Sequence, residues 1–244
     1  MEKEIYTGGK MFCQLVEVGG FAGAIQGMRH PKNSWRLQDS YYKDGEFILG
    51  ENDKKLAQTL IKGGSEHRKF LRMIHVQFNL NVPRYLLSEL DTYKVATVSN
   101  STSTQHKLLK ADDEKGWYET ELDRLLSTRG KLSRKNFWYA QEDDVLMFTI
   151  IEKLNQIREQ YLDTKNAQEK KHLRRRAKQI LPESYLQCRM IDMNYETLRT
   201  LYQQRKHHTL DIEWGVLLDF IESLPYAEEL LLYGIDKRKD VSNK

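Results

Sequence analysis

The sequence predicts an α+β fold, in which a single domain holds a central, mostly antiparallel sheet flanked by long helices. Apolar and polar residues alternate strictly from Ile74 to Leu80, which is typical of a half-buried strand. Apolar residues recur at helical spacing from Gln141 to Leu162, which predicts a long amphipathic helix. A helix, a break at Pro182, a strand and a second helix then follow within residues 173–205. Strands and long helices interspersed in this way favour a mixed fold.

The first half of the chain is expected to alternate short helices with strands. Pro83 suits the first position of a helix, and Gly63-Gly64 is a usual stop signal. The expected elements are a strand over 11–18, a helix over 22–28, a turn-rich loop over 30–52, a helix over 53–62, a short helix from about Ser65 that carries His67, the strand over 74–80, and a helix from Pro83 to Leu90.

The second half is expected to be mainly helical. Asp211 is the expected N-cap of the last helix, because its side chain can accept hydrogen bonds from free backbone N–H groups. The expected elements are a polar loop over Ser99–Thr104, a charged insertion over 112–136, a helix over 141–162, a charged helix over 165–181, a strand over 185–193, a helix over 198–205, and a last helix from Asp211 to about Tyr233. Residues 1–234 then form one domain, and 235–244 a charged tail.

Composition excludes several classes of protein. The chain of 244 residues is 39% hydrophobic and 30% charged, which is typical of a globular domain with a real core. No apolar run reaches the roughly 18 residues that a membrane span needs, and the first residues lack a signal-peptide pattern. We therefore expect a cytoplasmic protein. A net charge of +4 suits anionic small molecules but does not by itself indicate nucleic acid.

Cysteine and histidine placement argues against a thiol nucleophile and against a metal centre. Cys13 and Cys188 both lie in apolar, strand-like runs, so we expect buried, inert thiols. Adjacent histidines on a helix, such as His207-His208, point about 100° apart and rarely bind one ion, even with acidic residues nearby. The sequence holds no metalloprotease helix motif, dinucleotide fingerprint or phosphate-binding loop.

Arg205 is the most informative single charge. It lies seven residues after Leu198 on the apolar stripe of the predicted helix. Because an unpaired buried charge costs several kcal/mol, the guanidinium requires a partner. That partner is either an anionic or carbonyl-rich ligand, or a core carboxylate such as Asp192.

The residues around Arg205 resemble the flavin-dependent thymidylate synthases. That family has a helix ending in Ala-Arg-x-x-Leu-Pro, a strand, then Asn-x-x-x-Leu, an arginine, and a glutamate eight residues later. The same order appears here at the same spacing in Ala177-Lys178-Gln179-Ile180-Leu181-Pro182, Asn194, Leu198, Arg205 and Glu213. The resemblance implies that Arg205 contacts the pyrimidine of a bound uridylate and acts in catalysis. It also implies that Lys178 holds the 5′-phosphate.

A second motif resembles the family less closely. Glu66-His67-Arg68-Lys69-Phe70 is similar to the family's Glu-His-x-x-Phe, although a lone histidine near a helix start can equally be a surface or capping residue. In the family signature, Tyr93 stands for a histidine and Thr97 for a serine, and only Lys94 keeps a cation. The pattern from Phe70-Leu71-Arg72-Met73-Ile74 through Asp91-Thr92-Tyr93-Lys94 resembles a divergent phage and bacterial branch related to this family. In all, the resemblance covers residues 60–105 and 170–230.

The resemblance implies a set of binding residues. Its substrate-binding residues are Lys178, Arg205, Ser101, Ser103 and Glu89, and its FAD-binding residues are His67, Tyr93, Lys94, Thr97, Asn100 and Asn194. In the family, arginines of this signature hold the phosphates of the flavin, and here only the cation of Lys94 is kept. Each lost charge-assisted hydrogen bond costs about 1.5–3 kcal/mol, which weakens the expectation of FAD binding. Alternatively, residues 99–104 are simply a polar loop.

By resemblance, the expected reaction is the reductive methylation of dUMP to dTMP. Methylenetetrahydrofolate supplies the carbon, and FAD reduced by NADPH supplies the hydride. Family sites form between subunits, so we expect a homotetramer. The alternatives are an enzyme acting on another pyrimidine nucleotide or with another one-carbon donor, and a non-catalytic nucleotide-binding protein. A nucleic-acid-binding face at Lys170–Arg176 is a weaker alternative to a solvated helix face.

Overall fold

The computed structural model describes residues 6–109 and 131–238. Within them the chain forms two compact units. Of the described residues, unit 1 comprises 6–12, 81–90, 100–109 and 131–189, and unit 2 comprises 13–80, 91–99 and 190–238. The assignment of one domain over 1–234 stays a prediction. Most of the expected insertion at 112–136 lies outside the described residues, and so does the end of the tail.

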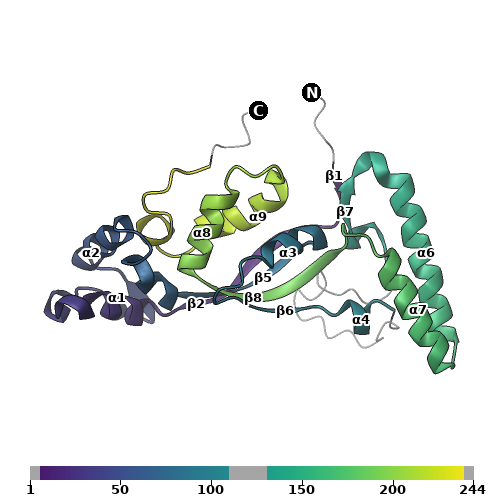
Figure 1. Ribbon diagram of the computed structural model, residues 1–244, viewed down its shortest axis with the longest axis horizontal. Helices are drawn as coiled ribbons and strands as arrows, with labels where there is room; N and C mark the ends of the chain where they lie inside the picture. Colours follow the sequence, from purple (N-terminus) through teal and green to yellow (C-terminus); the bar gives the residue numbers. More distant parts are fainter. Residues whose placement is uncertain (1–5, 110–130, 239–244) are drawn as a thin grey trace. The chain divides into compact units, whose positions relative to one another are not determined.

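Unit 1 is built around a long helical hairpin. Helices α6 and α7 lie side by side (Figure 1), and α7 ends just before Pro182, as the sequence predicts. The Asn155 side chain in α6 is buried, and it hydrogen-bonds both the N–H and the C=O of Leu132. The elements are β1 (Tyr6–Gly8), α3 (Arg84–Leu90), α4 (Thr104–Lys107), β7 (Trp138–Ala140), α6 (Asp144–Asp163) and α7 (Ala167–Ile180), with β1 antiparallel to β7.

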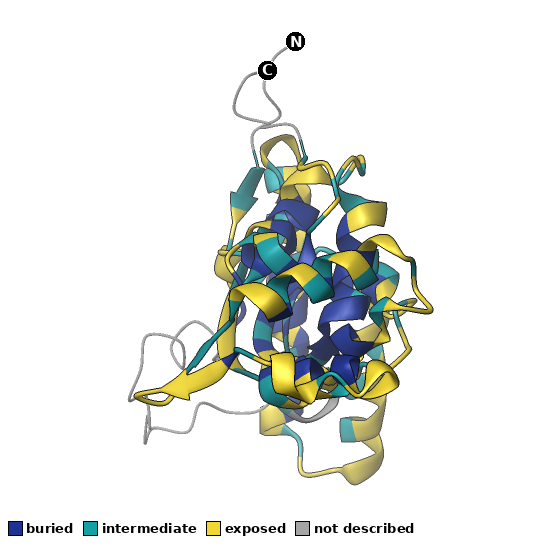
Figure 2. Ribbon diagram, turned by 90° about the vertical axis from the view of Figure 1, so that its left-hand side faces the viewer, coloured by how far each residue is buried: buried dark blue, intermediate teal, exposed yellow. Residues whose placement is uncertain are grey.

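Unit 2 packs helices around the strands that carry the candidate site. The alternating residues of 74–80 form a strand whose apolar side chains Val76, Phe78 and Leu80 are fully buried. Figure 2 shows that buried residues occupy the inner sides of the helices while the outer sides are exposed. The helices are α1 (Phe21–Arg29), α2 (Glu51–Lys62), the 3₁₀ helix η3 (Arg68–Met73), α8 (Tyr195–Arg205) and α9 (Asp211–Glu222).

One four-stranded sheet has the strand order β2-β5-β8-β6. Its strands are β2 (Phe12–Gly19), β5 (His75–Pro83), β6 (Val98–Ser101) and β8 (Leu186–Asn194). The prediction of a loop over Ser99–Thr104 was wrong for Ser99 to Ser101, which belong to the edge strand β6. An edge strand needs backbone pairing on one side only, so Ser and Asn side chains can face solvent along it. The Thr102 N–H extends this pairing by donating to Cys188 O at 2.9 Å.

Four other predictions were wrong in detail. Residues 30–52 contain the antiparallel hairpin β3 (Tyr41–Lys43) and β4 (Glu46–Ile48), which turns at Asp44-Gly45. The last helix ends at Glu222 rather than near Tyr233, because Pro225 cannot continue it. Asp211 is the first helical residue, and the N-cap is Leu210. His67 precedes η3 instead of lying within a helix.

A buried ion pair joins α1 to α2. Arg29 Nε–H donates to Asp53 Oδ1 at 2.5 Å, and the exposed fractions of the two side chains are 3% and 0%. The other oxygen, Asp53 Oδ2, accepts the N–H groups of Asp39 and Ser40. One carboxylate therefore fixes both the helix pair and the loop before β3.

Among the described residues, no helix is both long enough and apolar enough to cross a membrane.

We predict that Asp53→Asn destabilises the protein by about 3–5 kcal/mol, because it leaves the Arg29 charge buried without a carboxylate. Urea denaturation followed by circular dichroism measures the change. Glu51→Gln is the matched control, since Glu51 pairs with Lys54 on the exposed side of the same helix. Equal losses from the two substitutions would contradict the role given to Asp53.

The Cys188 thiol is expected to be unreactive in the folded protein. Burial raises its pKa to about 11, so at pH 8 only about one molecule in a thousand carries the thiolate that reacts. Alkylation by iodoacetamide should be slow in buffer and fast in urea, as measured by mass spectrometry of the Cys13→Ser variant. Rapid labelling of Cys188 in buffer would refute this assignment.

Candidate functional site

A pocket of about 560 Å³ lies within unit 2, where the segment 91–96 meets α8 and the start of β5. We call it the Tyr93 pocket. It contains three of the residues that the sequence assigns to cofactor binding, namely Tyr93, Lys94 and Asn194. The full lining is Arg72, His75, Thr92, Tyr93, Lys94, Val95, Ala96, Asn194, Glu196, Thr197, Thr200 and Gln204.

Arg205 is not part of the lining of this pocket, but it contacts Tyr93, which is. Its guanidinium carbon is 5.6 Å from the centre of the Tyr93 ring and 4.8 Å from that of the Trp214 ring. Arg205 Nε–H donates to the Tyr93 hydroxyl at 3.0 Å, and this hydroxyl donates to Gln204 Oε1 at 2.8 Å. The charge on the apolar stripe is thus stabilised by two aromatic faces. Asp192, the carboxylate considered as an alternative partner, interacts with His75 and Gln77.

Asn194 joins the strand β8 to helix α8 at the pocket. It is 2% exposed, and its Oδ1 caps α8 by accepting the Thr197 N–H at 2.9 Å. Because Oδ1 is engaged, the side chain offers its NH₂ group, which can only donate. The Thr197 hydroxyl donates to Val95 O at 3.1 Å and so holds the segment 91–96 against α8. Ala96 in that segment has a φ of 53°, a strained value that is typical of functional sites.

Glu196 brings a carboxylate to the pocket, but that carboxylate is neutralised by an arginine. Arg68 Nε–H donates to both Glu196 oxygens, at 2.9 and 3.0 Å. Nearby Arg199 donates to Leu231 O at 2.6 Å, and burial, with a smaller effect of Arg68, lowers its pKa to about 10. We therefore expect Glu196 to shape the pocket rather than to repel an anionic ligand.

Sequence reasoning missed a histidine–carboxylate pair at the pocket. His75 Nδ1–H donates to Asp192 Oδ1 at 3.0 Å, and Gln77 donates to Asp192 Oδ2 at 3.3 Å. Because a carboxylate only accepts, this bond places the proton on Nδ1 and leaves Nε2 as an acceptor in neutral His75. The available signal was that His75 and Gln77 lie on the polar face of one strand. Asp192, however, is 117 residues away from His75.

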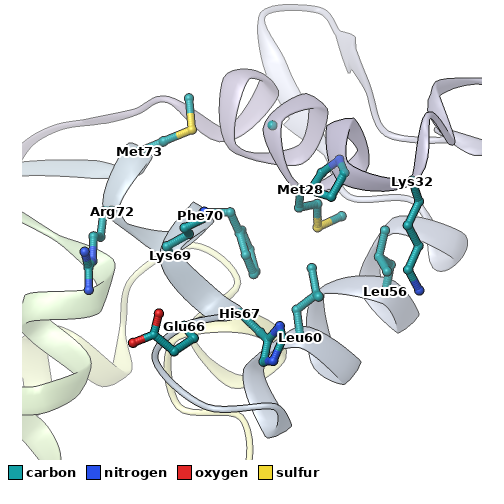
Figure 3. A pocket seen from close by; sticks show the side chains of 12 residues that line it. Met28, Lys32, Leu56, Leu60, Glu66, His67, Lys69, Phe70, Arg72 and Met73 are labelled. Atoms are coloured by element: carbon teal, nitrogen blue, oxygen red, sulfur yellow. The ribbon is translucent and has the colours of Figure 1, made fainter.

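The remaining predicted residues do not line the Tyr93 pocket. His67 lines a second pocket in unit 2, drawn in Figure 3, whose lining shares Arg72 with the first. Thr97 also belongs to unit 2, and its hydroxyl oxygen is buried with no hydrogen-bond partner among the described residues. Unit 1 holds the others, which are Glu89, Asn100, Ser101, Ser103 and Lys178.

The lining of the Tyr93 pocket suits a planar molecule that carries anionic groups. Tyr93 offers an aromatic ring, and Lys94 and Arg72 offer positive charge. Asn194 and the threonine hydroxyls offer directional hydrogen bonds. Within the part of the chain that the structure describes, no three His, Cys, Asp or Glu side chains are placed to hold a metal ion.

Comparison of the structure with solved structures identifies the fold, whereas comparisons of the sequence find no match. No protein-family model matches the sequence, and no curated protein matches it either.

Solved structures, in contrast, match over most of the chain. One is thymidylate synthase X from Helicobacter pylori with FAD and dUMP, which is 19% identical with a TM-score of 0.62. Another structure of this flavin-dependent enzyme from the same organism, also complexed with FAD and dUMP, is 18% identical with a TM-score of 0.62. Each match covers 90% of this chain and 96% of the other. This chain therefore has the fold of the flavin-dependent thymidylate synthases.

Proposed function

We propose that this chain is a flavin-dependent thymidylate synthase-like enzyme that methylates dUMP to dTMP. Methylenetetrahydrofolate supplies the carbon, and NADPH reduces the flavin. The observation that carries this proposal is the Tyr93 pocket, with Arg205 stacked behind its aromatic wall, on a chain that shares its fold with enzymes solved with FAD and dUMP.

The chemistry of the pocket supports flavin as the cofactor. Tyr93 can stack on a planar ring, and the Asn194 NH₂ can donate to a ring carbonyl. Lys94 and Arg72 can neutralise phosphate groups. When bound, the flavin supplies the hydride. The protein supplies orientation and a polar environment matched to the reacting ring.

Substrate binding is proposed to use the residues that the family resemblance implies. Arg205 contacts the pyrimidine, because its fixed guanidinium can donate to a ring carbonyl. Lys178, Ser101 and Ser103 hold the 5′-phosphate, and Glu89 contributes to the same subsite. We propose a homotetramer, in which residues of neighbouring chains complete each site.

Methylation at C5 also needs a proton acceptor, because the C5 hydrogen must leave as a proton when the new carbon bond forms. His75 Nε2 is proposed to accept it. Asp192 orients the histidine ring and fixes the tautomer in which Nε2 carries no proton. Both cysteines are left out of this chemistry, and the raised pKa of the Cys188 thiol agrees with that.

The direct test is whether the purified protein binds FAD and whether dUMP changes the visible flavin spectrum. Arg205→Gln should weaken dUMP binding about ten- to a hundredfold, the loss expected for one charge-assisted hydrogen bond. Titration with dUMP followed by flavin absorbance measures it. Lys206→Gln is the matched control, because Lys206 is the next cation along the chain and contacts Asp236 O.

Unchanged dUMP affinity in Arg205→Gln would contradict the role given to this residue. A stronger spectral response to another pyrimidine nucleotide would favour an enzyme with a different substrate. Nucleotide binding without any flavin binding would make the chain a non-catalytic nucleotide-binding protein.

Proton removal can be measured apart from ligand binding. With dUMP labelled by tritium at C5, we expect His75→Gln to slow tritium release at least about a hundredfold while FAD and dUMP affinities stay within about twofold. Gln77→Ala is the control, since Gln77 also contacts Asp192. Release at the wild-type rate from His75→Gln would remove His75 from the mechanism. No release from the wild-type protein would instead reject the proposed reaction.

A further inference from the structure

Helix α7 of unit 1 carries a charge pattern that the proposed reaction leaves almost unused. Six of its 14 residues are cations, and one, Glu169, is acidic. The proposed reaction assigns a role only to Lys178, near the C-terminal end of the helix. Five neighbouring positive charges therefore remain without a function. The six cations are Lys170, Lys171, Arg174, Arg175, Arg176 and Lys178.

The adjacent helix α6 has a different composition. It carries two cations, Lys153 and Arg158, and four acidic residues, which are Asp144, Glu152, Glu159 and Asp163. Mixed signs of this kind are typical of a solvated helix face. The two helices lie side by side (Figure 1), so the single sign of α7 is not a general property of the hairpin.

The cations on α7 are also placed four residues apart. Lys171 precedes Arg175, and Lys170 precedes Arg174, by about one turn of the helix. Like charges at this spacing repel each other and destabilise an isolated helix. Anions that lie along the helix would remove this repulsion. The spacing thus favours a ligand that carries several negative charges.

Packing against α6 turns these cations toward solvent. Leu173 and Ala177 are 2% and 0% exposed, and they belong to the same buried cluster as Leu154 of α6. Because successive helical residues are about 100° apart, Lys171 and Arg175 lie on the side opposite to this buried stripe. Both are exposed, so their charges are accessible to a large partner.

The described part of the chain supplies no ion pair for the exposed cations. Neither Lys171 nor Arg175 forms one with a carboxylate of residues 6–109 or 131–238. Lys170 and Arg174 lie over the Tyr161 ring, at 5.2 and 5.1 Å from its centre. An aromatic face attracts a cation but leaves its charge intact. The surface of α7 therefore stays positive after folding.

The form of this surface favours a nucleic acid duplex over other polyanions. A helix that lies on a membrane buries an exposed apolar face in the lipid, but the apolar face of α7 is covered by α6. Single strands are usually held by stacking on aromatic side chains, and α7 contains no Phe, Tyr or Trp. A duplex presents phosphates at regular intervals, which Lys and Arg contact without reading the bases.

We propose that α7 binds double-stranded nucleic acid through the phosphate backbone, with Lys171 and Arg175 as the central contacts. Lys170, Arg174 and Arg176 add positive charge around them. Binding of this kind is independent of base sequence. The proposal does not rest on the reaction assigned to the Tyr93 pocket, because neither central contact is among the residues assigned to dUMP or flavin.

The test is the salt dependence of DNA binding by the full-length protein. Fluorescence anisotropy of a labelled duplex gives the affinity between about 50 and 200 mM salt, and the slope of log affinity against log salt is about −0.9 per phosphate neutralised. The double variant with Lys171→Gln and Arg175→Gln should make this slope shallower by about 1.8 and weaken binding at least about tenfold at about 100 mM salt. Lys153→Gln is the matched control, because Lys153 is an exposed lysine on α6, and it should change neither quantity.

The result that would overturn the proposal is an unchanged salt slope in the double variant, with folding checked by near-ultraviolet circular dichroism. A wild-type affinity weaker than about 1 mM at the lowest salt would do the same. Tighter binding of a single strand, of poly-glutamate or of phosphatidylserine vesicles would assign the surface to another partner. Displacement of the duplex by dUMP or FAD would also reject the proposal, by assigning the duplex to the catalytic site. A duplex of scrambled sequence should bind equally well, and a preference for one sequence would contradict backbone recognition.

Discussion

The guanidinium of Arg205 lies on the apolar stripe of α8, and the arrangement of the candidate site depends on how this charge is accommodated. Tyr93 and Trp214 place their ring faces against it, and the Tyr93 hydroxyl accepts its Nε–H. The contacts with Tyr93 hold the segment 91–96 against α8, and the contact with Trp214 joins α8 to α9. Arg205 is half-buried, and one of the two rings that contact its guanidinium, Tyr93, also lines the pocket.

Charge neutralisation elsewhere in unit 2 is selective. Arg29 and Arg68 each have a carboxylate, while Arg199 has a backbone carbonyl and a lowered pKa. These three arginines hold elements together. Lys94, which lines the Tyr93 pocket, is exposed. The distinction separates charges that stabilise the fold from charges that remain available for anionic ligands.

Elements with a strong local signal were predicted well. The strand at 74–80, the helix that ends before Pro182 and the helix that carries Arg205 all follow from side-chain periodicity and one proline. The hairpin β3–β4 and the edge strand β6 were missed, because their short polar sequences gain strand structure only by pairing with a partner. Among the site residues, Tyr93, Lys94 and Asn194 do share one pocket, whereas His67 lines another.

The sequence by itself determined the order and type of the main elements and the residues that resemble a flavin-dependent thymidylate synthase. It also determined that Arg205 needs a partner, because the helical period places a charge on an apolar face. The tertiary structure alone decided which partner that is, since Tyr93 lies 112 residues away. The pairing of His75 with Asp192 was likewise decided only by strand order. Local periodicity fixes the face on which a side chain lies, but contacts between distant segments depend on how the whole chain packs.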